Sequence, residues 1–266
     1  MRTSVMLLLV GFSALGYGDT TVKTHTVSTD TGAPANVQNP SEHRDVHYRK
    51  GAMRRKDSLG GGATTIFSNI ANCDTRTGFL IDPVAREYRT YKVVRFSPPA
   101  QLDEYRKKNP RDVIEVQSTT VEMSERKTFF GHTARHFITT TKVVDSNKAT
   151  GEETVDGWYI DHDTPDNNCA PDYVHTDPFY AIGNALVTPP QVAHFKHTGP
   201  LPTGMAVQRI VTHKTPGSSG TAARVFRMEE TVEELSDSPL SPSLFELPSN
   251  VRENPSLLGG GSIHHE

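Results

Sequence analysis

His132 and His136 stand four positions apart, a spacing that places two imidazoles on one face of an α-helix, where they could hold zinc. Residues 137–144, however, are rich in β-branched and aromatic types and predict a strand. On a strand the two histidine Cα atoms would lie about 13 Å apart, too far for one metal ion. The metalloprotease pattern H-E-x-x-H also lacks its glutamate here, so we predict no metal site at these histidines.

Oxygen-bearing side chains are densest in residues 161–168, DHDTPDNN, and calcium prefers such ligands. The glycine expected at the sixth position of an EF-hand loop is missing, and Pro165 occupies a ligand position. This composition is more typical of a turn. The sequence also contains no G-x-S-x-G nucleophile elbow, dinucleotide-binding glycine pattern or phosphate-binding loop. It therefore predicts no catalytic residue, metal ion or cofactor.

Six aromatic residues fall on predicted strands and are candidates to line a ligand-binding interior. They are Phe67, Phe79, Tyr88, Tyr91, Phe137 and Trp158. An aromatic side chain on a strand belongs more often to a packed core than to a ligand site, so core packing is the alternative for each of them.

A basic cluster is formed by Arg49, Lys50, Arg54, Arg55 and Lys56. It could attract an anionic partner, but two short strands meeting at the Lys-Gly turn would place these charges on a solvated face. The whole chain has 28 Lys and Arg against 31 Asp and Glu, a net charge of -3. Because this balance supplies no field toward nucleic acid or anionic membrane, we favour the solvated face and predict no nucleic-acid partner.

The first 18 residues predict a cleaved secretory signal peptide. Arg2 supplies the positive charge, residues 5–15 form an apolar stretch, and Gly16 and Gly18 are the small residues before the cleavage site. The apolar stretch is shorter than the roughly 20 residues that a membrane-spanning helix needs. We therefore expect a soluble periplasmic or extracellular protein.

Cys73 and Cys169 are the two cysteines of the chain. In an oxidising compartment such a pair most simply forms a disulfide bond. Two buried free thiols are the alternative, because the sequence does not show whether the residues are close in space. Neither cysteine has a C-x-x-C partner, which disfavours a zinc site.

Short β-prone runs separated by turn residues fill the chain between residues 45 and 251. We predict strands at 46–48, 52–56, 64–70, 78–82, 87–96, 113–123, 127–130, 133–144, 154–161, 205–213 and 223–234. Their regular spacing predicts one antiparallel, largely meandering sheet. Helices are predicted at 100–108 and 179–186, and long connections at 162–178 and 189–203.

Both ends of the chain have the composition of disordered segments. Residues 19–44 are rich in Thr, Ser, Asn, Gly and Pro without apolar periodicity, and residues 252–266 include three consecutive glycines. The predicted organisation is therefore a signal peptide at 1–18, a disordered leader at 19–44, one β domain at 45–251 and a disordered tail at 252–266.

Several short phrases carry a resemblance to a known family. They are Tyr48, Lys50-Gly51 and Arg54; Leu80-Ile81-Asp82 with Tyr88; GHTARH at 131–136; DGWYI at 156–160; and LSPSLFELP at 240–248. Together they resemble exported bacterial domains of unknown function related to the outer-membrane lipoprotein-carrier superfamily. The resemblance implies a strongly curved antiparallel sheet, an incomplete β-barrel, with one or two short helices across its concave side. Carriers of that superfamily hold acyl chains in this space.

The sequence and the resemblance together predict a mainly β protein with a single curved antiparallel sheet. We expect a non-enzymatic binding or carrier module for a lipid, a lipoprotein acyl chain or another apolar ligand. Large aliphatic side chains around a void would favour this function. Converging polar groups would favour a hydrolytic enzyme, and a filled interior with an exposed apolar patch or sheet edge would favour an envelope structural or interaction protein.

Overall fold

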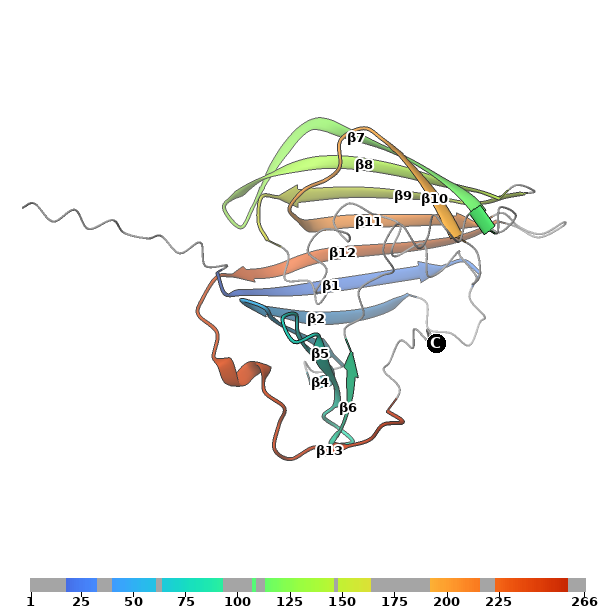
Figure 1. Ribbon diagram of the computed structural model, residues 1–266. Coiled ribbons are helices and arrows are strands. Elements are labelled where there is room, and N and C mark those ends of the chain that lie inside the picture. Colours follow the sequence, from blue (N-terminus) through green and yellow to red (C-terminus); the bar gives the residue numbers. More distant parts are fainter. Residues whose placement is uncertain are drawn as a thin grey trace, which may run out of the picture.

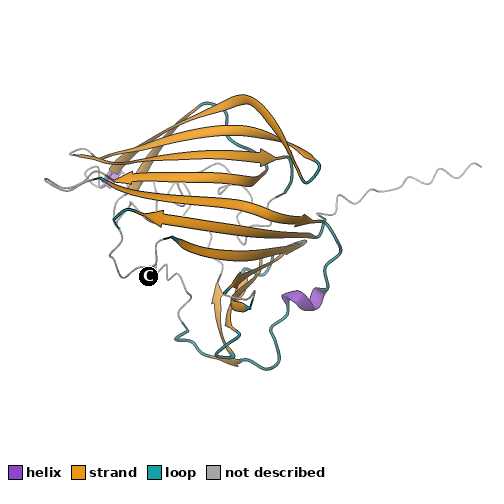
Figure 2. Cartoon of the chain, turned by 180° about the vertical axis from the view of Figure 1, so that it is seen from behind, coloured by secondary structure: helices purple, strands orange, loops and turns teal. Residues whose placement is uncertain are grey.

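The computed structural model describes residues 18–32, 40–60, 64–92, 107–108, 113–145, 148–163, 192–215 and 223–257. These residues form one large, open, curved sheet that does not close into a barrel, as Figures 1 and 2 show from opposite sides. The predicted fold class, mainly β with a single curved sheet, is therefore confirmed.

The sheet has 13 strands in the order β10-β7-β8-β9-β11-β12-β1-β2-β3-β4-β5-β6-β13. Along the chain these are β1 (Thr20–Asp30), β2 (Ser41–Lys50), β3 (Met53–Leu59), β4 (Thr65–Asn72), β5 (Thr77–Asp82), β6 (Glu87–Lys92), β7 (Val113–Phe129), β8 (His132–Asp145), β9 (Lys148–Ile160), β10 (Val192–Thr198), β11 (Met205–Thr215), β12 (Arg224–Ser236) and β13 (Arg252–Glu253). A short 3-10 helix, η3 (Pro242–Phe245), lies between β12 and β13.

Neighbouring strands are antiparallel throughout the interior of the sheet, as predicted. The two outermost pairs, β10 with β7 and β13 with β6, are parallel. Pairing of β12 with β1 joins the late strands to the early ones, so that residues about 200 positions apart lie on adjacent strands (Figure 1).

The predicted disorder of residues 19–44 is wrong for β1 and for the start of β2. Along β1, buried Thr20, Val22, Thr24 and Thr26 alternate with less buried residues. Threonine and valine are β-branched and favour strands, although a count of strongly apolar residues misses the threonines. Because β1 lies between β12 and β2, both of its edges are hydrogen-bonded, and a segment with few apolar residues becomes a central strand.

Three further boundaries differ from the prediction. β10 lies inside the stretch 189–203, which was expected to be a connection. The predicted strands 113–123 and 127–130 are one strand, β7, whose pairing with β8 shifts register between Glu122 and Arg126. This irregularity keeps the strand continuous where turn residues predicted a break. The predicted disordered tail is wrong for residues 252–257, which include β13 and the buried Leu257.

Of the predicted helix 100–108, the structure describes Lys107 and Lys108, and both are helical. The remainder of that helix and all of 179–186 lie outside the described residues. Within the part of the chain that is described, no helix is long and apolar enough to cross a membrane.

Among the described residues, two apolar clusters hold the sheet together. One contains Val22, Ala134, Trp158, Ile160, Met205, Val207 and Val232. It lies where the β1–β12 and β11–β9 ladders shift register, and bulges of this kind increase local twist. The other cluster packs Phe245 of η3 against Ile70 and Ile81, and so fastens the segment after β12 onto β4 and β5.

Cys73 follows β4, and its backbone N–H donates to the carbonyl oxygen of Ala52 at 3.0 Å. Cys169 lies outside the described residues, so the disulfide bond between them stays a prediction. Mass spectrometry of the unreduced protein should give a mass two hydrogens below that of the reduced chain. Two thiols that alkylate without denaturant or reductant would contradict it.

Candidate functional site

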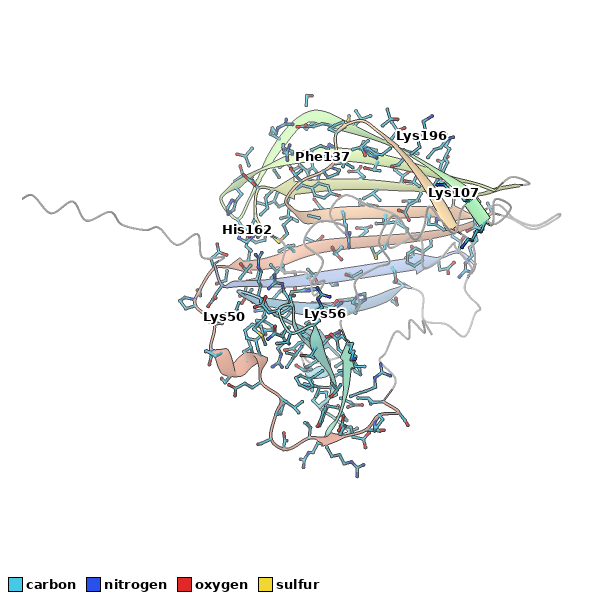
Figure 3. The ribbon with its side chains drawn as sticks, viewed as in Figure 1. Lys50, Lys56, Lys107, Phe137, His162 and Lys196 are labelled. Carbon is cyan, nitrogen blue, oxygen red and sulfur yellow. The ribbon has the colours of Figure 1, made fainter. Side chains whose placement is uncertain are left out.

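Cross-strand register divides the sheet into two faces, because directly paired residues point to the same side. Phe137 pairs with Gly157, which pairs with Arg209, and the same row continues across β12 and β1. We call this side, on which Figure 3 labels Phe137, the Phe137 face. The opposite side carries Trp158, and we call it the Trp158 face.

The Phe137 face carries most of the buried polar side chains of the described residues. All of them except Asp57 and Ser68 lie on this face: Thr20, Thr24, Thr26, Asp45, Arg49, Ser118, Thr120, Thr139, Thr141 and Glu153. Buried apolar side chains lie between them, among them Val116, Phe137 and Leu80. The face is thus a mixture of apolar and hydroxyl-bearing groups, unlike the aliphatic lining expected of a purely apolar cavity.

Hydroxyls on β7 and β8 satisfy one another across the two strands. Thr120 and Thr139 lie 2.8 Å apart, Oγ1 to Oγ1, and Thr141 donates to Ser118 over 3.4 Å. Hydrogen bonding of this kind reduces the cost of burying polar groups. These pairs can therefore persist on a buried face without a charged partner.

Glu153 on β9 is the buried carboxyl group of this region, with an exposed fraction of 7%. It pairs with Thr141 of β8 on one side and with His213 of β11 on the other. Burial raises the pKa of Glu153 to about 7, against an opposing effect of the Arg209 charge. Burial also lowers the pKa of His213, and the Arg224 charge adds to this effect. A carboxyl group with such a pKa can donate a hydrogen bond near neutral pH.

An aromatic pair and an ion pair lie on the same face, around Gly157, four residues from Glu153 along β9. The rings of Phe137 and Tyr159 meet edge to face at 5.7 Å, and Tyr159 covers Gly157, where an added Cβ would lie 2.7 Å from the tyrosine ring. Arg209 Nε lies 3.0 Å from Glu230 Oε1. Gly157 therefore provides the space into which the tyrosine ring folds along its own strand.

The six predicted lining aromatics divide equally between the two faces. Phe67, Tyr91 and Phe137 belong to the Phe137 face by register. Phe79, Tyr88 and Trp158 belong to the opposite face. The first two of these pack with η3, and Trp158 stacks on His136 with ring centroids 4.4 Å apart. Trp158 nevertheless shares an apolar cluster with Val22 and Val232, close to the bulges of β1–β12 and β11–β9.

The basic cluster also divides between the faces, because β2 and β3 alternate their side chains. Arg49, Arg54 and Lys56 share the Phe137 face, whereas Lys50 and Arg55 lie on the other. The expected solvated face is wrong for Arg49, which is 6% exposed and lies 3.1 Å from the Asp163 carboxylate. Lys56 pairs with the buried Asp45 at 2.9 Å.

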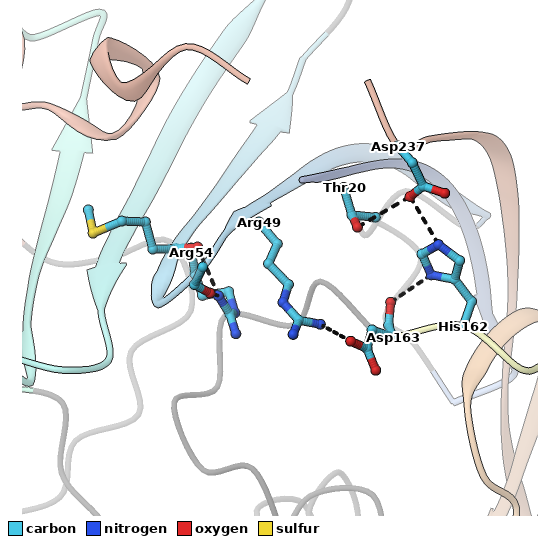
Figure 4. A network of polar contacts seen from close by, with 8 residues as sticks. Thr20, Arg49, Arg54, His162, Asp163 and Asp237 are labelled. Atoms are coloured by element: carbon cyan, nitrogen blue, oxygen red, sulfur yellow. Dashed lines mark hydrogen bonds and ion pairs between the residues drawn. The ribbon is translucent and has the colours of Figure 1, made fainter. Parts of the chain in front are cut away.

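A polar network connects the end of β9 to β1, β2 and β12, and Figure 4 shows its contacts. His162 Nε2 lies 3.1 Å from Asp237 Oδ1, and Nδ1 lies 2.8 Å from the Asp163 carbonyl oxygen. Thr20 also donates to Asp237, over 3.4 Å. The segment after β9 is thereby fixed to strands that are distant in the sequence.

The network is not arranged as a nucleophile relay. The Thr20 hydroxyl and the His162 imidazole contact the same carboxylate, so the imidazole is not placed to take the hydroxyl proton. Both ring nitrogens face oxygen acceptors, and the ring satisfies both contacts as a donor only with a proton on each nitrogen. The arrangement suits a structural connection between strands more than acyl transfer.

The residues that first suggested metal chemistry have other contacts. His136 lies on β8, as predicted, with Nε2 2.7 Å from the Asp156 carboxylate. His132 meets the edge of the His162 ring, with centroids 5.8 Å apart. In the part of the chain that the structure describes, no group of three His, Cys, Asp or Glu side chains could hold a metal ion. Residues 164–168 of the oxygen-rich segment lie outside it.

Sequence reasoning missed the polar residues of the Phe137 face. Ser118 and Thr120 on one strand and Thr139 and Thr141 on the next are spaced by two, which puts each pair on one face. That spacing was the sequence signal by which these buried hydroxyls could have been predicted. Glu153 and its neighbour His213 carry no such signal, because their association depends on strand order.

Comparison with known proteins gives limited similarity. No protein-family model and no curated protein matches the chain. An uncharacterized conserved protein from Thermus thermophilus is similar over 90% of each chain, with 5% identity and a TM-score of 0.39. A DUF1329 family protein from Desulfovibrio piger is similar over 88% of this chain and 91% of that one, with 7% identity and a TM-score of 0.28. Similarity at this level transfers no residue role.

Proposed function

We propose that the protein is an exported, non-enzymatic binding module whose Phe137 face holds an amphipathic ligand, such as a lipid with a polar group. One observation carries this proposal: the buried face of an open sheet presents hydroxyl and charged side chains beside apolar ones. A purely apolar ligand would match only part of that face. The predicted signal peptide supports the exported location.

Half-buried apolar side chains provide a surface on which the apolar chain of such a ligand can pack. Val155, Val211 and Met228 pair in one row across β9, β11 and β12. All three keep intermediate exposure although they belong to the buried face. Each methylene that a ligand transfers from water to apolar surface contributes about 0.8 kcal/mol before ordering costs. A chain lying along this row would therefore bind favourably.

Two neighbouring residues of β11 test this proposal. Val211→Trp places a large ring on the Phe137 face, and Thr212→Trp places the same ring on the Trp158 face. The probe is dodecyl maltoside below its critical micelle concentration, titrated by calorimetry. We expect Val211→Trp to abolish binding and Thr212→Trp to retain it.

Thermal unfolding of both variants establishes that each is folded before the titrations are compared. Equal binding by the two variants would place the ligand elsewhere. The proposed function would be contradicted if the unsubstituted protein bound none of three compounds: dodecyl maltoside, dodecyl phosphate and dodecyltrimethylammonium.

A further inference from the structure

A single row of polar side chains crosses five strands of the Phe137 face. His197 of β10 pairs with Ser118 of β7, which pairs with Thr141 of β8. Thr141 pairs with Glu153 of β9, which pairs with His213 of β11. Neighbouring strands are about 4.8 Å apart, so the row extends over about 19 Å. We call it the His197–His213 row.

One member of the row, His197, buries polar atoms that lack hydrogen-bond partners among the described residues, and Glu153 adds a buried carboxyl group to the row. Both ring nitrogens of His197 are buried without a partner. The carboxyl group of Glu153 is more than nine-tenths buried, and no described residue forms a hydrogen bond or an ion pair with it. A buried polar group that stays unsatisfied raises the free energy of the folded protein. A ligand that supplied the missing partners would recover this energy.

The chemistry of the row specifies the kind of ligand group. Serine and threonine hydroxyls both donate and accept, and a neutral imidazole does each once. The row contains no lysine or arginine, the usual partners of a phosphate. Basic groups on this face already have carboxylate partners: Arg209 with Glu230, Arg224 with Asp30, Lys56 with Asp45 and Arg49 with Asp163. Groups that both donate and accept, distributed along the ligand, match the row best.

We propose that the His197–His213 row binds a neutral, hydroxyl-rich group, such as a sugar, carried by the ligand of this protein. This inference rests on the proposed function and specifies the polar part of the amphipathic ligand. The sugar hydroxyls would donate to the histidine and glutamate acceptors and to Thr141 Oγ1, whose own proton goes to Ser118, and they would accept from Ser118. The apolar chain would follow the neighbouring row of Val155, Val211 and Met228.

Two adjacent threonines of β8 provide a matched test. Thr141→Val removes a hydroxyl from the row without a large change in shape, and Thr140→Val makes the same change on the opposite face. We expect Thr141→Val to weaken dodecyl maltoside binding about tenfold and Thr140→Val to leave it unchanged. Glu153→Leu should weaken it at least as much, whereas Glu153→Gln, which still donates and accepts, should retain most of it.

Dodecyl phosphate and dodecyltrimethylammonium share the apolar chain and differ in the polar group, so the head-group preference can be read directly. We expect both to bind more weakly than dodecyl maltoside and to be insensitive to Thr141→Val. Equal binding of dodecyl phosphate, or no effect of Thr141→Val and Glu153→Leu, would overturn the sugar inference while leaving the proposed function intact. If none of the three compounds binds the unsubstituted protein, both proposals fail.

Discussion

Replacement of Phe137 by alanine lowers the free energy of unfolding by about 3–5 kcal/mol. The side chain is 1% exposed and packs edge to face against Tyr159, with the Arg135 guanidinium 5.1 Å from its ring centroid. Its partner across β9 is Gly157, which has no side chain to fill the space that the substitution leaves. Urea unfolding of the purified protein measures this loss.

Phe130→Ala is the matched control for that experiment, because Phe130 lies in the turn of the same hairpin and is 41% exposed. We expect its effect to stay within about 0.5 kcal/mol. Similar losses for the two variants would mean that the Phe137 face is not the packed side of β8.

We expect the Glu153→Gln variant to be more stable than the unsubstituted protein at alkaline pH. Its free energy of unfolding should also lose the pH dependence that Glu153 causes. Burial raises the pKa of Glu153 from 4.5 to about 7 in the folded protein. The folded state therefore binds this proton more tightly than the unfolded state, so the contribution of Glu153 to stability falls as the pH rises from about 4.5 to 7. Above that window the ionised, buried carboxylate costs about 3 kcal/mol relative to the glutamine variant.

Unfolding in urea at several pH values between about 4 and 8 tests this difference. The control is Glu152→Gln, the adjacent position of β9, whose side chain is 41% exposed and lies 3.4 Å from Lys142. Glu152→Gln should change stability by less than about 1 kcal/mol. Parallel pH profiles for Glu153→Gln and the unsubstituted protein would show that Glu153 is not buried.

Most strands could be predicted from the sequence because their β-branched and aromatic runs are bounded by turn residues. The runs at 78–82, 133–144 and 205–213 each fall within an observed strand, with boundaries one or two residues away. β1 was missed because its buried positions are mostly threonines, which count as polar but fit a pleated surface well. Its stability comes from the strands on both sides, and these are distant in the sequence.

The two faces could not be predicted, because they follow from register and from bulges. Phe137 and Trp158 were both candidates to line a ligand-binding interior, and the local register of β8 and β9 puts Phe137 opposite Gly157 and so places Trp158 on the other side of these two strands. A change of one residue in register moves every side chain of a strand to the other face. The His197–His213 row depends further on the parallel pairing of β10 with β7, which no local pattern indicates.

The most direct test of the account is to locate a bound ligand on one face of the sheet. In an NMR measurement of the protein with dodecyl maltoside, we predict intermolecular nuclear Overhauser effects from the dodecyl chain to the methyl groups of Val155, Val211 and Met228. The maltose protons should show contacts to the side chains of Thr141 and His213. Contacts confined to Trp158-face residues such as Ile138 and Ile210, or no intermolecular contacts at saturating ligand, would contradict binding at the Phe137 face.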